Sequence, residues 1–377
     1  GLAQWHDYHY YYGHVMWDLE VFALPPLVLL QPDAARTVLD FRFERREAAR
    51  RNAKLYGRRG LQFPWESSMT TGEESTPGAG HGAWHEDHVT LDVAHAFAQY
   101  AMATGDTLFL RERAWPILKG AAEWLASRLT PSRRGYELRQ TVGIAETGQP
   151  VDNDAFTLMA ARVVLNDTLW CARELDLPTR PSWADMAEHL ALPIRDHVIQ
   201  SHDGFKASEP KGATPGPLAG LFPFWYPAEP EMARATLEFY LGLADKYIGS
   251  PMLSAIYGVW AAWLGDRRRS LDLFDAGYGQ FVDDRFMQTY EYRPDRWPEQ
   301  PKAGPFFANL GGFLLGLLYG LPGLHIRTHE PSTWPSRPVV LPETWDAVEV
   351  EQLWVHGRPA RLIAPHGADR ARIELHA

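Results

Sequence analysis

Apolar side chains recur at three- and four-residue spacing along most of the chain, which is typical of helices that bury one face. In the segment 154–176 this stripe includes Phe156, Met159 and Trp170, and Asp152 or Asn153 is placed to cap its start. The pattern therefore predicts a mainly α-helical protein. The expected helices cover 32–51, 88–104, 113–129, 154–176, 181–200, 229–245, 252–264, 268–282 and 306–319.

Long segments rich in glycine, proline and aromatic residues separate many of these helices. Connections of this length are usually functional or disordered, and the Trp, Phe, Glu and His that they contain argue against disorder. A toroid of helical hairpins with its site at one end would show this alternation of long and short connections. The segments are 1–16, 56–84, 130–153, 201–228 and 283–305.

The periodicity changes after Gly323, where helical spacing gives way to alternating apolar and polar residues over 337–377. His356-Gly357 marks a hairpin turn within this stretch. We therefore expect a helical domain over 1–325 and a small β domain of three or four strands over 326–377.

Acidic residues outnumber basic ones, 47 against 37, which gives a formal net charge of −10. This balance argues against nucleic-acid binding, which needs a basic face to neutralise phosphates, and against docking on anionic membranes. The longest apolar run, 21–30, is too short to span a membrane and contains Pro25 and Pro26.

Cys171 is the single cysteine, so no disulfide framework, zinc cluster or iron–sulfur site can be built from cysteine. It sits in an apolar helical pattern, which favours a buried inert thiol over a nucleophile. One free thiol fits a reducing cytosol without requiring it. The 15 Trp, 15 Tyr and 17 Phe fit either a large core or a site for flat apolar ligand faces, such as those of sugars.

Four short motifs combine aromatic, acidic and glycine residues. They are GHVMWDLE at 13–20, GLQFPWES at 60–67, VGIAE at 142–146 with VDNDAFT at 151–157, and TYEY at 289–292 with NLGGFL at 309–314. In this order they resemble glycoside hydrolase family 65. Within it the chain is most similar to the glucosidases of glucosyl-galactosyl-hydroxylysine, and it also resembles the maltose, kojibiose and trehalose phosphorylases.

The resemblance covers nearly the whole chain and implies an all-α fold, a six-hairpin (α/α)6 barrel over 1–325 with the β segment 326–377 as an appendage. Family members carry a large β-sandwich before the first motif. It is absent here, so we expect a fragment or a processed chain. The resemblance further implies an inverting reaction on a small carbohydrate substrate, with no cofactor and no metal.

The resemblance also assigns the general acid. The family carries it as the Glu of a Gly-Pro-Asp-Glu-Tyr-His segment, which a Val-Asn/Asp-Asn segment follows. Residues 143–148 occupy that place and 151–153 match, so Glu146 is the expected acid that protonates the leaving oxygen. Its apolar neighbours Ile144 and Ala145 would raise its pKa. The Asp, Tyr and His of the family segment are missing, which alters the surroundings of the leaving group.

Inverting hydrolysis needs a second carboxylate, roughly 6.5–9.5 Å from the acid, that activates water. In the glucosidase-like members a Phe stands five residues before a Trp-Thr-Glu base. Here Phe286 stands five residues before Glu291, with Tyr290 in place of Thr. The family's phosphorylases have a phosphate-binding loop instead, so Glu291 favours a hydrolase. Asp295 and Glu299 in the same loop are alternatives for this carboxylate.

Two further pairs are expected to bind the glucose. Trp17-Asp18 matches a Trp-Asp pair of the family, whose carboxylate accepts hydrogen bonds from adjacent hydroxyl groups and whose indole faces the ring. Capping of a helix is the alternative role for Asp18. Trp65-Glu66 matches a Trp-Glu pair of the same pocket.

Lys211 matches a family lysine near the glucose, although Gly212 replaces the glutamine that follows it there. Trp84 and Tyr290 fall on loops that we expect to converge on the pocket. The aromatic residues expected in the core instead are Phe156, Trp170 and Phe313.

Histidine and carboxylate residues gather around the predicted helix start at 88. A metal cluster is one interpretation, because His88, Asp92 and His95 could share a helix face. A helix start beside the cleft, with histidines at its rim, is the interpretation we favour, since the resemblance implies no metal. The residues are His81, His85, Glu86, Asp87, His88, Asp92 and His95.

We therefore expect an inverting glycosidase that removes a terminal α-linked glucose from kojibiose-like or glucosyl-galactose substrates, with Glu146 as acid and Glu291 as base. One alternative is a disaccharide phosphorylase of the same family, which uses phosphate in place of water. The other is a carbohydrate-binding protein without catalysis, which the altered residues after Glu146 motivate. Neither a nucleic acid nor a membrane is expected as a partner, and the sequence leaves the oligomeric state open.

Overall fold

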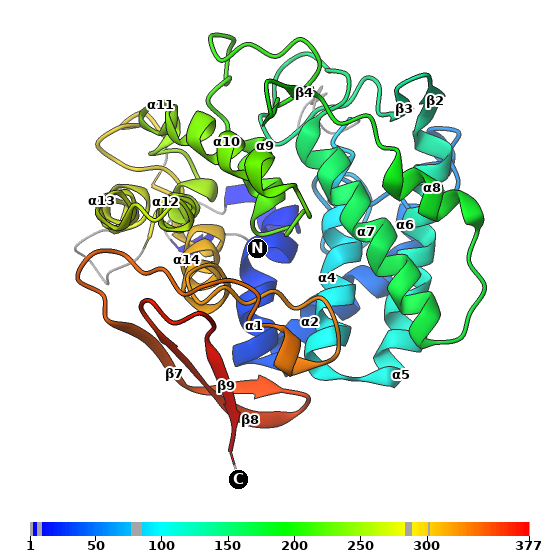
Figure 1. Cartoon of the computed structure of the whole chain (residues 1–377). Helices are drawn as coiled ribbons and strands as arrows, with labels where there is room; N and C mark the ends of the chain where they lie inside the picture. The colour runs from blue at the N-terminus through cyan, green and yellow to red at the C-terminus, as the bar shows by residue number, and fades with distance from the viewer. Residues whose placement is uncertain (1–2, 6–9, 77–84, 283–288, 301, 377) are drawn as a thin grey trace.

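Helices are the main regular elements of the chain, and a small antiparallel sheet near the C-terminus lies at one end of the helical body (Figure 1). The computed structural model describes residues 3–5, 10–76, 85–282, 289–300 and 302–376. The predicted mainly helical chain with a C-terminal β segment is confirmed. The helices are α1 (Leu24–Leu30), α2 (Pro32–Glu44), α3 (Arg46–Leu55), α4 (His88–Thr104), α5 (Thr107–Phe109), α6 (Trp115–Arg128), α7 (Ala155–Glu174), α8 (Pro181–Glu188), α9 (Gly216–Leu221), α10 (Pro230–Leu241), α11 (Ala244–Tyr247), α12 (Tyr257–Trp263), α13 (Arg267–Gly277) and α14 (Phe307–Leu315).

Helix α4 lies at the centre of the packing. Every residue from His88 to Ala103 is buried, and the helix contacts α1, α2, α6 and α7. It ends at Gly105, whose φ of +65° is the left-handed conformation that glycine adopts without steric cost. The predicted range 88–104 is therefore confirmed, and this helix carries His88 to the underside of the site described below.

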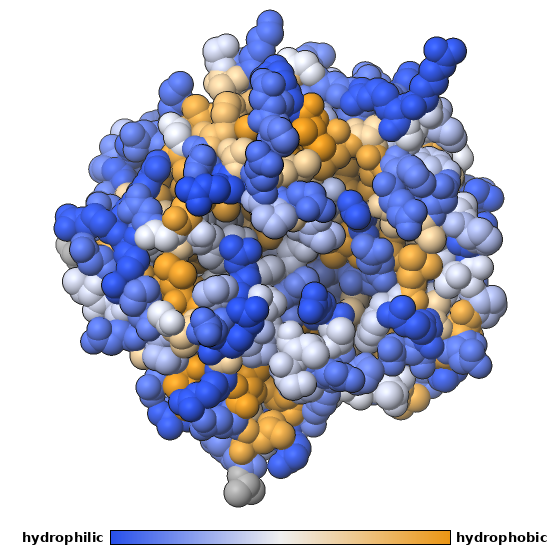
Figure 2. Space-filling model, in the orientation of Figure 1, coloured by the Kyte–Doolittle hydropathy of each residue, from blue (hydrophilic) through white to orange (hydrophobic). Residues whose placement is uncertain are grey.

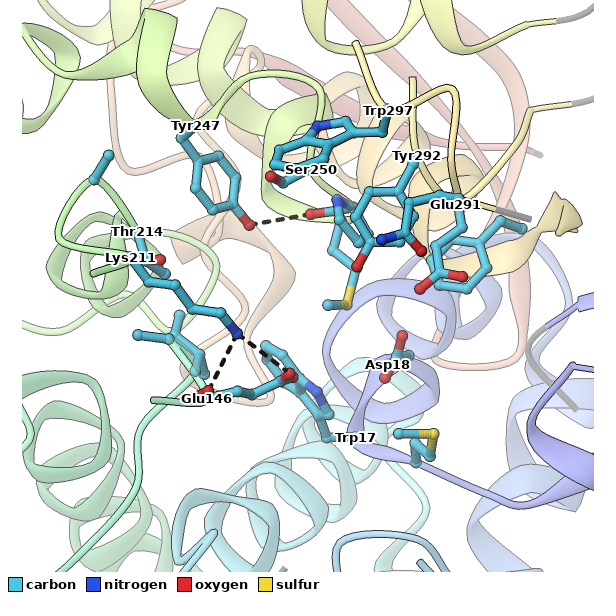
Figure 3. Close-up of a pocket in the computed structure, with 18 of the residues that line it drawn as sticks. Trp17, Asp18, Glu146, Lys211, Thr214, Tyr247, Ser250, Glu291, Tyr292 and Trp297 are labelled. Atoms are coloured by element: carbon cyan, nitrogen blue, oxygen red, sulfur yellow. Dashed lines mark hydrogen bonds and ion pairs between the residues drawn. The ribbon is translucent and has the colours of Figure 1, made fainter. Parts of the chain in front are cut away.

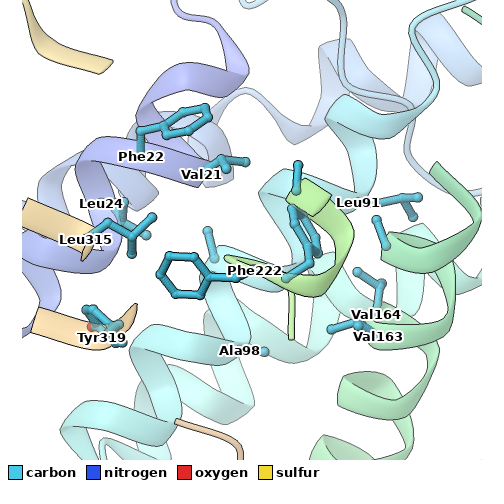
Figure 4. Packing of buried hydrophobic residues seen from close by; sticks show 14 of the residues in the cluster. Val21, Phe22, Leu24, Leu91, Ala98, Val163, Val164, Phe222, Leu315 and Tyr319 are labelled. Carbon is cyan, nitrogen blue, oxygen red and sulfur yellow. The ribbon is translucent and has the colours of Figure 1, made fainter. Parts of the chain in front are cut away.

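Buried side chains from distant parts of the chain meet in one core. Figure 4 shows Phe222, which follows α9, among Leu24 of α1, Ala98 of α4, Val163 of α7 and Leu315 of α14. Because these helices share one core, the loops at their ends can come together from sequence positions far apart. The outline of the molecule is mostly hydrophilic (Figure 2). Among the described residues, no helix combines the length and apolarity needed to cross a membrane.

Three helix predictions need correction. The predicted helix 32–51 is broken at Arg45, where α2 ends and α3 begins. The predicted helix 181–200 ends at Glu188, and a hairpin of β4 and β5 follows. Positive φ at Asp196 and His197 makes the turn of that hairpin, which a helix cannot accommodate. The cap of α7 is Asp154, whose carboxylate accepts from the N–H of Thr157 at 2.8 Å, in place of the predicted Asp152 or Asn153.

Helix α1 lies in the apolar run 21–30, which is not among the helix ranges expected from the sequence. Pro25 and Pro26 occupy its first turn, where a backbone N–H has no helical partner to lose. A short π-helix, η2 (Leu19–Ala23), precedes it.

The C-terminal sheet has the order β7-β8-β9, and the predicted turn at His356 and Gly357 joins β7 to β8 with positive φ at both residues. A two-stranded pair, β1 with β6, connects the N-terminal segment to the segment before α14. Tyr11, further along the N-terminal segment, contacts Glu291 in the loop before α14. The strands are β1 (Ala3–Trp5), β2 (Thr130–Ser132), β3 (Gly135–Glu137), β4 (Ile194–Arg195), β5 (Val198–Ile199), β6 (Gly304–Phe306), β7 (Ala347–Val355), β8 (Arg358–Pro365) and β9 (Arg372–Leu375).

Candidate active site

A cavity of about 470 Å³ collects residues from the N-terminal segment, the loop before α7 and the loop before α14. Figure 3 shows Glu146 and Lys211 on one side of the open space, with Asp18 and Glu291 on the other. The lining residues are Tyr11, Met16, Trp17, Asp18, Trp65, Ile144, Ala145, Glu146, Lys211, Ala213, Thr214, Lys246, Tyr247, Ser250, Pro251, Met252, Glu291, Tyr292, Trp297, Gln300 and Phe306.

Asp18 stands at the start of η2 with a helical backbone and makes no side-chain capping bond, so the capping alternative is wrong. It is 3% exposed. Burial raises the pKa of Asp18 well above its usual range, and the negative charges of Glu291 and Glu146 raise it further. Asp18 lines the cavity, where its carboxyl group can accept hydrogen bonds from a ligand.

Glu146 lies on a loop that the paired backbones of Thr141 and Val151 close. Its own φ is +46°, and its N–H donates to the carbonyl oxygen of Gly143 at 2.8 Å. A side chain on Gly143 would clash with the carboxylate of Asp154, the cap of α7, so glycine allows the loop to lie against that helix end. The strained loop thereby holds the Glu146 side chain at the cavity.

The environment of Glu146 favours its neutral form. Its side chain lines the cavity and is 44% exposed, and desolvation by the surrounding protein raises the pKa of Glu146. Lys211 and His88 oppose that shift. The Nζ of Lys211 donates to the backbone carbonyl of Glu146 at 3.1 Å and lies 3.9 Å from its Oε2. A ligand that displaced water from the cavity would raise the pKa further.

Glu291 is the buried carboxylate of the loop before α14, at 3% exposed. Burial raises the pKa of Glu291 to about 7; the hydrogen bond from Tyr11 opposes this shift, and the negative charge of Glu146 adds to it. The Tyr11 hydroxyl donates to Glu291 Oε1 at 2.6 Å. Asp295 is held by Arg293 at 2.7 Å and does not line the cavity.

Asn309 fixes the backbone around Glu291. Its Nδ2 donates to the carbonyl oxygens of Tyr290 at 2.5 Å and of Glu291 at 3.1 Å, while its Oδ1 accepts from the N–H of Met252 at 2.6 Å. The side chain is buried, so these bonds do not compete with bulk water. Asn309 thus ties two of the loops that line the cavity to α14.

Trp17 and Trp65 line the cavity and rest on His88. Their rings meet the imidazole edge-on at 4.9 and 5.8 Å. Burial alone lowers the pKa of His88, but hydrogen bonds to Asp92 at 2.7 Å and Glu86 at 3.1 Å outweigh it and raise this pKa to about 10. A protonated imidazole therefore supports both tryptophans. Trp17 is only 1% exposed, so a small part of its surface meets the cavity.

Two predicted site residues, Glu66 and Tyr290, are not among the residues that line the cavity. Glu66 hydrogen bonds to His14 at 2.7 Å and is not among the lining residues. Tyr290 is buried and likewise absent from the lining, whereas its neighbour Tyr292 is present. Trp84 and Phe286 lie outside the described residues. The predicted core positions of Phe156 and Trp170 are confirmed, and Phe313 is only partly buried.

The histidines near the start of α4 have partners within the protein. His85 bonds to the carbonyl of Gln140 at 2.8 Å, and His95 to Asp167 at 2.7 Å. Neither Glu86 nor Asp87 lines the cavity. Within the described part of the chain, no three His, Cys, Asp or Glu residues gather so as to hold a metal ion; His81 lies outside that part.

Five aromatic residues at the cavity were not assigned a site role from the sequence: Tyr11, Tyr247, Tyr292, Trp297 and Phe306. Tyr292 and Trp297 meet edge-on at 6.0 Å, and Trp297 is 36% exposed at the cavity. Their signal was the aromatic content of the predicted loop 283–305. Tyr247 closes a short helix just past a predicted helix end, where nothing in the pattern marks a site.

The cavity is arranged for acid–base chemistry on a polar ligand. Asp18, Glu146 and Glu291 share it, and burial raises the pKa of all three carboxyl groups, which favours their protonated forms. One carboxyl group can donate a proton while another accepts one. Cys171 is remote from this chemistry, because it is buried in α7 and burial raises the pKa of its thiol to about 12.

Comparison with known proteins gives concordant results. Residues 8–212 match the glycosyl hydrolase family 65 central catalytic domain. A kojibiose hydrolase of Flavobacterium johnsoniae is 32% identical over 84% of this chain and 45% of that protein. The protein-glucosylgalactosylhydroxylysine glucosidase of Gallus gallus is 31% identical over 84% of this chain and 44% of that protein. The chain thus spans about half the length of these curated relatives.

Two further likenesses involve phosphorylases. A kojibiose phosphorylase of Caldanaerobacter subterraneus subsp. tengcongensis is 40% identical over 159 residues, which are 39% of this chain and 20% of that protein. Among solved structures, a putative kojibiose phosphorylase from human microbiome superposes with a TM-score of 0.72 at 14% identity, covering 97% of this chain and 61% of that one. This superposition shows a shared fold.

Proposed function

From the premise that this chain belongs to glycosyl hydrolase family 65, we propose that it hydrolyses a terminal α-linked glucose from a small glucoside, with inversion at the anomeric carbon. Kojibiose and glucosyl-galactose are the proposed substrates, because the relatives that share most of the chain are named as a kojibiose hydrolase and a glucosylgalactosylhydroxylysine glucosidase. The chain therefore belongs to a family that acts on small sugars, and the hydrolytic reaction is the proposal.

The observation that carries hydrolysis is the presence of two carboxyl groups, Glu146 and Glu291, in one cavity. Both side chains line the cavity, and the charge of Glu146 raises the pKa of Glu291. An inverting hydrolase needs such a pair with room for a water molecule between base and sugar. A phosphorylase needs no base here, since phosphate is itself the nucleophile.

In the proposed reaction, Glu146 donates its proton to the glycosidic oxygen as the bond from that oxygen to the anomeric carbon breaks. Glu291 removes a proton from the water that attacks the same carbon from the opposite face. Desolvation raises the pKa of Glu146, which favours the protonated form that a general acid needs. The products are β-glucose and the alcohol of the aglycone.

The glucose would be held by Asp18, Trp17, Trp65 and Lys211. The position of the Asp18 carboxyl group at the cavity, with no capping bond, supports its role as acceptor for two adjacent hydroxyl groups. Lys211 lines the cavity next to Glu146. Glu66 lacks this support, because it pairs with His14 and is not among the lining residues.

We also propose that the helices form a six-hairpin (α/α)6 barrel over 1–325 and that 326–377 is a separate small β domain. The shared core of α1, α4, α7 and α14 supports the barrel (Figure 4). The break between helical and alternating patterns, with β7 to β9 in one sheet, supports the division.

An inverting disaccharide phosphorylase is the second candidate. It is favoured by the 40% sequence identity, over 159 residues, between this chain and a kojibiose phosphorylase. It would release β-glucose 1-phosphate from kojibiose only when phosphate is present. A third candidate, carbohydrate binding without catalysis, is favoured by the loss of the family's residues after Glu146. It predicts measurable kojibiose binding with no glucose released over days.

The experiment is an assay of glucose release from kojibiose and glucosyl-galactose in phosphate-free buffer. We expect release by the unmodified chain, and a loss of about 10²–10⁴-fold in kcat for Glu146→Gln and for Glu291→Gln. Glu299→Gln is the matched control, because Glu299 is exposed in the same loop and does not line the cavity. Near-normal turnover by Glu146→Gln would show that the acid is assigned wrongly.

A further inference from the structure

A second cavity, of about 540 Å³, shares no lining residue with the carboxylate cavity. It lies between the loop after α9, helix α10, the end of α12 and the segment 325–337, which is orange in Figure 1. Met252 of the carboxylate cavity comes just before η4 (Leu253–Ile256) and α12, whereas Trp263 at the end of α12 lines the second cavity. The helical rise separates the two by roughly 15–20 Å.

A row of three rings lies along the second cavity. The ring centroids of Trp263 and Trp225 are 5.3 Å apart, and Trp225 stacks on His325 at 4.7 Å with an interplanar angle of 7°. Trp225 has a φ of +55°, a left-handed conformation that is costly for a bulky residue and that functional sites often retain. Burial, helped by nearby positive charges, lowers the pKa of His325 to about 3, so its ring is neutral.

Two arginines without acidic partners flank this row. The guanidinium of Arg337 lies over Trp263, 3.9 Å from the ring centroid. Arg327 is close enough to His325 to affect its pKa. Neither arginine forms an ion pair with any carboxylate of the described residues, whereas Arg234, which lines the same cavity, is paired with Glu238 at 2.9 Å.

The missing counter-charge matters because Arg337 is largely withdrawn from water. Burial lowers the pKa of Arg337, which reflects a guanidinium that has lost hydration without gaining a carboxylate. The chain as a whole carries a net charge of −10. Two unpaired cations on one cavity of an acidic protein indicate a ligand that supplies the negative charge.

We propose that the second cavity binds a small sugar phosphate, with its phosphate group between Arg337 and Arg327 and its sugar against the ring row. A guanidinium matches phosphate oxygens in bidentate geometry, and a dianion satisfies two cations where a carboxylate satisfies one. The volume is that of a small-ligand site. Ser336 and Tyr226 add hydroxyl groups to the lining, as a sugar requires.

The test is isothermal titration of the whole chain with glucose 6-phosphate, inorganic phosphate and glucose at low ionic strength. We expect saturable binding of glucose 6-phosphate, and a loss of about 10–100-fold in affinity for Arg337→Gln and Arg327→Gln, since each removes charged hydrogen bonds. Arg234→Gln is the matched control and should bind within twofold of the unmodified chain, because its charge is already neutralised by Glu238. Binding should also persist in Asp18→Asn, which changes only the carboxylate cavity.

The other outcomes overturn the proposal. If inorganic phosphate binds as tightly as glucose 6-phosphate, the cavity recognises an anion alone and the sugar assignment is wrong. If glucose 6-phosphate does not bind, or binds equally to the Arg327→Gln variant, the site is wrong altogether. Arg327 is exposed, so this variant should fold even if Arg337→Gln does not.

Discussion

The hydrogen bond from Tyr11 to Glu291 allows a sharp test of the proposed base. The Tyr11 hydroxyl donates to Glu291 Oε1 at 2.6 Å, and this bond lowers the pKa of Glu291 by stabilising the charged form. A hydrogen bond to a charged group contributes about 1.5–3 kcal/mol. Since one pKa unit corresponds to about 1.4 kcal/mol, Tyr11→Phe should raise the pKa of Glu291 by about 1–2 units.

The effect has a defined sign in the pH profile of kcat/KM. Glu291 must be deprotonated to activate water, so activity rises with pH through its pKa, which is about 7 in the unmodified chain. Tyr11→Phe should move this acid limb to higher pH and reduce kcat/KM at pH 6 by about 10–100-fold, with a smaller loss as the pH rises.

Tyr12→Phe is the matched control, because Tyr12 is the neighbouring tyrosine and is 70% exposed. Its acid limb should coincide with that of the unmodified chain. The acid limb of Tyr11→Phe could instead stay in place or move to lower pH. Either result would refute the assignment of Glu291 as the base whose titration sets this limb.

Three further substitutions give distinct signatures. Asn309→Ala removes three hydrogen bonds that position the Glu291 loop, so kcat should fall about 10–100-fold while KM changes severalfold at most; a rise in KM alone would contradict this role. His88→Gln removes a positive charge that lowers the pKa of the proposed acid, so the basic limb of kcat/KM should move to higher pH, and an unmoved limb would contradict it. Arg42→Ala leaves the buried carboxylate of Glu20 without its bidentate partner, so urea unfolding should show a loss of about 3–5 kcal/mol; a loss below about 1 kcal/mol would be inconsistent with that ion pair.

Helix limits could be predicted where one residue sets the backbone. Gly105 ends α4 at the expected place, and His356-Gly357 makes the expected turn, because both need positive φ. The segment after Glu188 was misleading, since its apolar residues also have helical spacing and only the turn at Asp196 and His197 shows that the chain reverses. Helix α1 was not predicted because Pro25 and Pro26 interrupt the apolar run, although the first turn of a helix accepts proline.

The residues of the candidate site could be predicted where a local motif contains them, but their partners could not. Asp18, Glu146 and Glu291 each lie in a short motif that can be identified locally, and the structure brings all three to one cavity. The partner of Glu291 is 280 residues away in sequence at Tyr11, a contact that no local pattern encodes. Glu66 fits its motif equally well, yet its orientation toward His14 depends on the packing of the N-terminal segment.

Proton NMR of the glucose released from glucosyl-galactose, in which the cleaved residue is the single source of glucose, tests the central claim most directly. In phosphate-free buffer, the proposed mechanism predicts that the anomeric signal of β-glucose rises first and that α-glucose follows only through mutarotation. Initial release of α-glucose would contradict inversion. Release that begins only when phosphate is added, with glucose 1-phosphate as the product, would contradict the role of Glu291 as a base that activates water.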